Sequence, residues 1–203
     1  MNLRATAFFF VSSMLLAGCS SDNGNSNVIV LPPQSLTILV TNDDGIGAPG
    51  IDSLVNTLLQ LENVDIKVVA PAENQSGSSD KTTDGEVVWE NSSTVSGVSA
   101  IAVFGFPADS VRVALEELDI VPDLVVSGVN QGQNVGPFAE LSGTVGAARY
   151  AARAGFPAVS GSAGLGANAD YAAASALVAT WIEDNRSALA NNSASTETVT
   201  SFK

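Results

Sequence analysis

Histidine is missing from this 203-residue protein, and cysteine occurs once, as Cys19. Without histidine, a Ser-His-Asp or Cys-His catalytic centre, a histidine-ligated zinc site and a histidine-based pH switch are all excluded. A single cysteine excludes an intrachain disulfide and a cysteine-rich metal site. Any chemistry must therefore use carboxylates, hydroxyls, amides, lysine or arginine, and a bound metal would be held through oxygen atoms.

Basic residues are also scarce. Lys and Arg number 8 against 21 Asp and Glu, which gives a net charge of −13, and only 14% of the residues are charged. An acidic surface repels nucleic-acid backbones and anionic lipid headgroups, so we expect no polymeric nucleic acid as a partner. A small anion could bind only where a cation or aligned backbone N–H groups offset this field. The length and the 45% apolar content suffice for one α/β domain.

The N-terminal segment is typical of a secretory signal peptide. Arg4 precedes an uncharged run from Ala5 to Gly18, which is too short to span about 30 Å of hydrocarbon. The run ends in Leu-Leu-Ala-Gly before Cys19, which resembles the lipobox of bacterial lipoproteins, where the cysteine is acylated. We therefore expect a lipoprotein signal peptide over residues 1–18 and lipidation at Cys19. An ordinary signal peptide with an incidental cysteine is the alternative.

This interpretation predicts a location. Residues 19–35 are rich in Ser and Asn and are expected to form a flexible tether. The folded part would be lipid-anchored in the bacterial cell envelope, in the periplasm or at the outer membrane or cell surface. It would contact the membrane through the lipid anchor only.

Beyond the tether, short apolar runs alternate with segments of helical periodicity. This order predicts an α/β domain over residues 36–184, with a doubly wound, mostly parallel sheet flanked by helices. Residues 77–97 are expected to be flexible and residues 185–203 to form a polar tail. Strands are expected at 36–40, 66–70, 98–104, 124–126 and 158–160, and helices after Pro49, after Pro107, over 144–154 and over 169–184.

Polar motifs follow three of the expected strands. Asp43 and Asp44 come after the first, Ser76 after the second and Asn130 after the fourth. Because the carboxyl ends of parallel strands share one edge, these residues should converge there. Two carboxylates, a hydroxyl and an amide oxygen suit Mg²⁺ or Mn²⁺. For Asp-Asp-Gly alone, the alternative is a tight turn in which an Asp caps the next helix.

Two further motifs could bind an anion. Ser142, Gly143 and Thr144 open an expected helix, whose free N–H groups could hold a phosphate. The alternative is a capping Ser with a Gly for close packing. The loop from Asn130 to Gly136, which includes Asn134, could turn backbone donors inward, or could simply be flexible.

Five ordered segments between about residues 36 and 161 resemble the SurE family of survival-protein nucleotidases. They read ILVTNDDGIGAPGI, VVAPAENQSGSS, GFPADSVRVAL, PDLVVSGVNQGQNVG and LSGTVGAARYAARAGFPAVS. The resemblance implies a Rossmann-like phosphatase that uses Mg²⁺ or Mn²⁺ to hydrolyse nucleoside 5′- or 3′-monophosphates or other small phosphomonoesters. It implies that the metal ligands are Asp43, Asp44, Ser76 and Asn130, and that Asn42, Ser142, Gly143 and Thr144 line the phosphate region.

On this resemblance we assign catalysis to Asp43, which could orient or deprotonate the attacking water, with Asn42 beside it. The alternative is a lipoprotein that binds a metal or nucleotide but turns it over weakly. Family members usually continue with another strand and a long arm used in oligomer contacts, so the resemblance implies a shortened C-terminal part here. It leaves a homodimer open.

Overall fold

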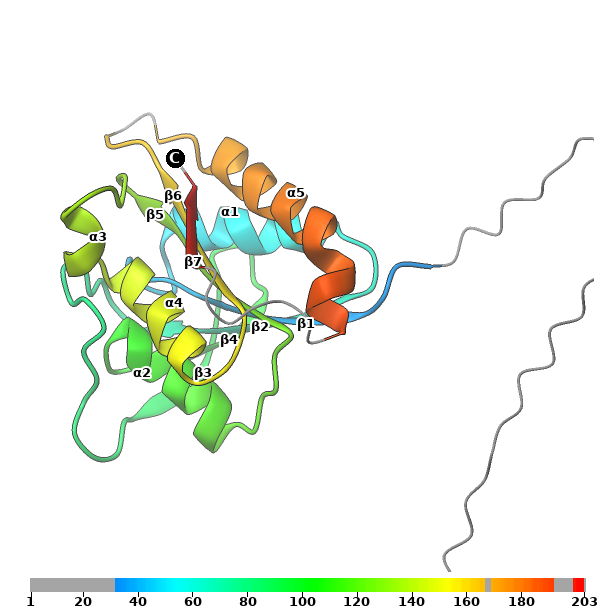
Figure 1. Cartoon of the computed structure of the whole chain (residues 1–203). Helices are drawn as coiled ribbons and strands as arrows, with labels where there is room; N and C mark the ends of the chain where they lie inside the picture. The colour runs from blue at the N-terminus through cyan, green and yellow to red at the C-terminus, as the bar shows by residue number, and fades with distance from the viewer. Residues whose placement is uncertain (1–31, 167–168, 192–198, 203) are drawn as a thin grey trace, which may run out of the picture. The chain divides into compact units, whose positions relative to one another are not determined.

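Parallel strands form the centre of the fold (Figure 1). The computed structural model describes residues 32–166, 169–191 and 199–202. Seven strands lie in the order β3-β4-β2-β1-β5-β6-β7, and all neighbours are parallel except the first pair. They are β1 (Leu36–Thr41), β2 (Val64–Pro71), β3 (Trp89–Ser93), β4 (Ser99–Val103), β5 (Leu124–Gln131), β6 (Ala158–Ala163) and β7 (Val199–Phe202).

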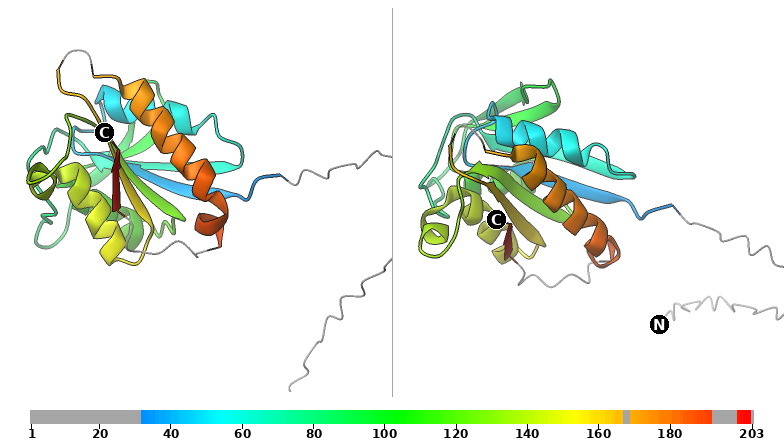
Figure 2. Two further views of the ribbon diagram at one scale, coloured as in Figure 1. Left: turned by 45° about the horizontal axis from the view of Figure 1, so that its top comes forward. Right: turned by 90° about the horizontal axis from the view of Figure 1, so that it is seen from above.

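Helices cover both faces of the sheet, which confirms the predicted doubly wound α/β architecture (Figure 2). On one face α1 (Pro49–Leu58) packs beside α5 (Tyr171–Ala190). On the other face α2 (Pro107–Arg112) packs beside α4 (Gly143–Arg153), and a π-helical turn, Val113–Glu117, extends α2.

The central strand β1 shows why the sheet is buried on both faces. Ile38 and Val40 belong to the apolar cluster under α1 and α5, whereas Leu39 belongs to the cluster under α2 and α4. All three side chains are fully buried. A continuous apolar run is the pattern that a parallel strand between two helical layers requires.

Helix α5 continues beyond the predicted boundary at residue 184, to Ala190. Its last turns are buried through Leu189 and through Arg186, which is only 6% exposed. The Arg186 guanidinium donates to the Gln34 carbonyl and pairs with Glu183. The predicted polar tail is therefore wrong for its first six residues, because an arginine with satisfied hydrogen bonds can occupy a buried helix face.

Two strands were not predicted. β3 lies at one edge of the sheet within the segment expected to be flexible, and β7 lies at the other edge within the expected tail. The sequence of β3, Trp-Glu-Asn-Ser-Ser, has no apolar run, and none of its residues is fully buried. An edge strand with little burial gives no periodic apolar signal.

The N-terminal predictions cannot be placed on this fold. The predicted signal peptide, Cys19 and most of the tether lie outside the described residues. Among the helices that are described, none is long and apolar enough to cross a bilayer.

Glycine 50 allows α1 to approach the sheet closely. A Cβ atom at this position would lie 1.9 Å from the carbonyl oxygen of Val129 in β5, a distance too short for any non-bonded contact. Since the loop from Asn42 to Ala48 joins β1 to α1, this contact also fixes where that loop lies over the edge of the sheet.

We expect Gly50→Ala to lower the free energy of unfolding by about 1–3 kcal/mol, because the methyl group overpacks the contact between α1 and β5. Urea unfolding measures the change. Gly47→Ala is the matched control, since a Cβ there meets nothing within 4 Å. A Gly50→Ala protein as stable as Gly47→Ala would contradict the close approach.

Candidate active site

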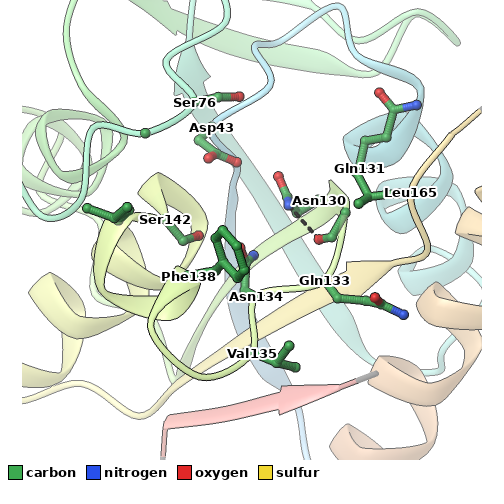
Figure 3. Close-up of a pocket in the computed structure, with 13 residues that line it drawn as sticks. Asp43, Ser76, Asn130, Gln131, Gln133, Asn134, Val135, Phe138, Ser142 and Leu165 are labelled. Atoms are coloured by element: carbon green, nitrogen blue, oxygen red, sulfur yellow. Dashed lines mark hydrogen bonds between the residues drawn. The ribbon is translucent and has the colours of Figure 1, made fainter.

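A pocket of about 420 Å³ opens at the carboxyl edge of the sheet, beside the ends of β1, β2 and β5 (Figure 3). Segments far apart in sequence meet there, as the parallel topology predicts. Five of the predicted site residues line it: Asp43, Ser76, Asn130, Asn134 and Ser142. The remaining side chains of the wall are Gln131, Gln133, Val135, Phe138, Leu141 and Leu165.

Asp43 is the buried charge of the site, with 2% of its surface exposed. Its Oδ1 atom accepts a short hydrogen bond from the Thr144 hydroxyl at the start of α4. Burial raises the pKa of Asp43 to about 6. The bond from Thr144 opposes this rise, and the neighbouring charge of Asp44 adds to it. A cation in the pocket would favour the ionised form.

Asp44 joins three segments at the same edge. Its Oδ1 accepts from Asn74 Nδ2 at 3.1 Å and its Oδ2 from the Gln131 backbone N–H at 3.1 Å. It lines a neighbouring cavity of about 400 Å³, beside Tyr171, and not the pocket of Asp43. The two adjacent carboxylates thus line two neighbouring cavities. Of the four predicted metal ligands, Asp44 is the one that does not line the pocket of the other three.

The amide of Asn130 is held in one orientation. Its Nδ2 donates to the Gly132 carbonyl at 2.7 Å, and in Figure 3 its side-chain oxygen lies on the side of Asp43. Ser76 is exposed on the loop after β2 and is positioned by its backbone N–H, which donates to Asn74 Oδ1 at 3.0 Å. The pocket therefore presents carboxylate, amide and hydroxyl oxygens.

These oxygen donors fit a hard divalent cation, which accepts carboxylate, amide and hydroxyl ligands and retains water. Nowhere in the described ranges do three or more His, Cys, Asp or Glu side chains form a metal-binding group. The residues that could hold a cation are therefore Asp43, Ser76 and Asn130, with Asp44 beside them.

The placement of Asn42 does not support its predicted catalytic role. The side chain is fully buried and does not line the pocket. Its Nδ2 donates to the Gly45 carbonyl at 2.9 Å, which closes the turn that presents the two aspartates. Asn42 is thus a positioning residue.

The predicted phosphate-binding residues divide into two groups. Ser142 lines the pocket and caps α4, because its Oγ accepts the Val145 N–H at 3.1 Å. Thr144 is fully buried against Asp43, and a Cβ at Gly143 would lie 2.8 Å from the Asp43 Cβ. Gly143 and Thr144 therefore do not line the pocket, and they position the aspartate from the helix start.

Asn134 and the apolar wall complete the pocket. Asn134 lines it, and its Nδ2 donates to Ser162 Oγ in β6 at 2.9 Å. The apolar part was not predicted. Its residues lie in polar, Gly-rich segments, where an apolar side chain is not expected to pack into the core, and this position is the signal that could have revealed them. The apolar part consists of Val135, Phe138, Leu141 and Leu165, all exposed.

Comparison with known proteins gives one consistent family. The family model described as Survival protein SurE matches residues 38–201. The chain is 45% identical over 132 residues to 5′-nucleotidase SurE 2 of Chlamydia caviae, covering 62% of this chain and 46% of that protein. It is 48% identical over 123 residues to 5′-nucleotidase SurE of Halobacterium salinarum, covering 60% and 45%.

Solved structures agree with the sequence comparison. The crystal structure of the SurE protein from Aquifex aeolicus aligns with a TM-score of 0.69 at 28% identity, covering 81% of this chain and 64% of that one. The chain spans about half the length of the curated relatives it matches.

The raised pKa of Asp43 predicts a pH dependence of stability in metal-free protein. Between about pH 4 and pH 6 the native state binds more protons at Asp43 than the unfolded state does, so the free energy of unfolding falls as the pH rises. The total loss is about 3 kcal/mol, and Asp43→Asn should abolish it. Urea unfolding of EDTA-treated protein from pH 4 to 7 measures the difference between the two proteins. Parallel pH profiles would show that Asp43 titrates normally.

Proposed function

Because the chain belongs to the SurE family, we propose that it is a metal-dependent phosphomonoesterase that hydrolyses nucleoside 5′(3′)-monophosphates to nucleoside and phosphate. The relatives that are named 5′-nucleotidases support this activity. The observation that carries the proposal is the meeting of Asp43, Ser76 and Asn130 in one pocket.

We propose Mg²⁺ or Mn²⁺ as the cofactor, held by Asp43, Ser76 and Asn130 with Asp44 beside them. When bound, the cation would neutralise phosphate charge and make the phosphorus atom more open to attack. No histidine, cysteine or lysine ligand is needed for such a site.

Asp43 would act as the general base. The Thr144 hydroxyl holds Oδ1, which fixes the carboxylate so that its other oxygen can take a proton from the attacking water. Without the cation the pKa of Asp43 is about 6, and a bound cation would favour the carboxylate form, which is the form that accepts a proton. The water oxygen would bond to phosphorus as Asp43 takes a proton from it, and the bond from phosphorus to the nucleoside oxygen would break. That oxygen would take up a proton from solvent water, and Asp43 would release its proton to solvent.

Ser142 would contact the phosphate. Its Oγ already accepts the Val145 N–H, which leaves the hydroxyl hydrogen free to donate. Since Ser142 lines the pocket, that hydrogen can reach a phosphate oxygen and stabilise the charge that develops there.

Phosphate release from AMP with added Mn²⁺ tests the activity. We expect Asp43→Asn to lower kcat at least about a hundredfold, because the amide cannot take the proton of the attacking water. EDTA should abolish the wild-type activity, and added Mn²⁺ should restore it.

Asp65→Asn is the control, since Asp65 is an exposed carboxylate near the amino end of β2, paired with Lys67. Equally slow phosphate release by wild type and Asp43→Asn, with AMP still bound, would favour the alternative of a binding lipoprotein with little turnover.

We also propose that the protein is a lipid-anchored component of the bacterial cell envelope. The support is the sequence Leu-Leu-Ala-Gly-Cys ending at Cys19, after an uncharged run. With a net charge of −13, membrane attachment would depend on the acyl groups.

We expect Cys19→Ala expressed in a bacterium to move from the membrane fraction to the soluble or secreted fraction, because alanine offers no thiol for acylation. Fractionation with an antibody to the folded domain measures this change. Ser20→Ala serves as the control, since it leaves the cysteine in place. Unchanged membrane association of Cys19→Ala would rule out the lipid anchor.

A further inference from the structure

The pocket has two chemically different parts. One part carries the oxygen atoms of Asp43, Ser76 and Asn130. The other part is an apolar wall formed by Val135, Phe138, Leu141 and Leu165. Figure 3 shows Val135, Phe138 and Leu165 of this wall. A ligand that fills the whole pocket must therefore have one end that suits oxygen donors or a cation and another end that is apolar.

The side chains of the apolar wall are exposed and do not pack into the hydrophobic core. Phe138 is 68% exposed and Leu165 is 79% exposed. Of the ten large apolar side chains that are exposed in the described part of the protein, four line this one pocket. Such a concentration of exposed apolar surface marks a binding site, because single exposed apolar residues elsewhere are ordinary.

Two segments hold the wall in place. Phe138 and Leu141 are the first and last residues of the single-turn helix α3 (Phe138–Leu141), and residues three apart share a helix face. Leu165 follows β6 and packs over the loop after β5, since a Cβ at Gly132 would lie 2.9 Å from its side chain. The aromatic ring and the aliphatic side chain thus come from different segments and meet at one cavity.

We propose that Phe138 is the platform on which the nucleobase of the substrate stacks, in the pocket that Leu141 and Leu165 also line. This inference rests on the proposed function, and it adds a residue that selects nucleotides over phosphomonoesters that lack a base. A flat aromatic ring stacks on Phe through its face and tolerates different bases, so the site favours the nucleotide class more than one particular base. Purines, with the larger ring, should bind better than pyrimidines.

The neighbouring cavity offers a competing aromatic residue, Tyr171. That cavity holds Asp44 but none of Asp43, Ser76 and Asn130. The Gln131 N–H donates to Asp44 at 3.1 Å, and Gln131 marks the boundary because it lines both cavities. A phosphate beside Asp43 shares its own pocket with Phe138, and this continuity favours Phe138 as the platform.

The kinetic test compares AMP with ribose 5-phosphate, which has the same phosphate ester without the base. We expect Phe138→Ala to raise KM for AMP about tenfold, with a much smaller effect on ribose 5-phosphate, because loss of base stacking weakens only the nucleotide. Phe138→Tyr should restore the preference. Phe104→Ala is the matched control, since Phe104 is 54% exposed and does not line the pocket.

A binding measurement separates this inference from the proposed function. Adenosine is titrated into EDTA-treated protein by calorimetry, and we expect Phe138→Ala to bind it about tenfold more weakly than wild type or Phe138→Tyr. If wild type binds adenosine in this way but hydrolyses neither ester, the proposed function fails and the platform stands.

Three outcomes overturn the platform and leave the hydrolase intact. In the first, wild type hydrolyses AMP and ribose 5-phosphate equally well, and Phe138→Ala does not change the ratio. In the second, Tyr171→Ala and not Phe138→Ala raises KM for AMP, which would put the base in the neighbouring cavity. In the third, Phe138→Ala dissociates an oligomer in sedimentation without changing KM, which would make the wall an interface between copies.

Discussion

The buried carboxylate of Asp43 at the start of α4 is the interaction on which the site depends. Thr144 holds one of its oxygens, and the missing side chain of Gly143 lets the helix start approach it. The first turn of a helix favours an anion, and here the protein supplies that anion itself. The carboxylate therefore has a fixed position, which a base or a metal ligand requires.

Burying a carboxylate at this edge of the sheet is unfavourable, and hydrogen bonds to the neighbouring Asp44 offset part of the penalty. Burial of Asp43 beside Asp44 disfavours the ionised state, as the raised pKa of Asp43 reflects. Asp44 in turn is stabilised by Asn74 and by the N–H of Gln131. Such a pair of adjacent carboxylates is typical of functional sites, where a bound cation relieves the repulsion. The hydrogen bonds of Asp44 also tie together the loops that form the pocket.

The sequence predicted the parts of this site that follow from topology. Apolar runs located five of the seven strands, and parallel pairing placed Asp43, Ser76 and Asn130 at one pocket. The sequence did not predict which hydrogen-bond partner each polar side chain would have. Asn42 closes a turn, because its amide nitrogen donates to the Gly45 carbonyl and its side chain does not line the pocket. Nor could periodicity reveal Phe138, since its exposure depends on how α3 sits beside α4.

The acidic charge of the protein would limit how the proposed phosphate-ester substrate is bound. The net charge is −13, and the pocket lining contains Asp43 but neither Lys nor Arg. Long-range attraction therefore does not draw an anionic substrate in. In the proposed function, affinity would come from short-range interactions with a cation held by the oxygen donors, with the Ser142 hydroxyl and with the apolar wall at Phe138. If Phe138 stacks on a nucleobase as proposed, selectivity among phosphate esters and binding of the phosphate would reside in different parts of the same pocket.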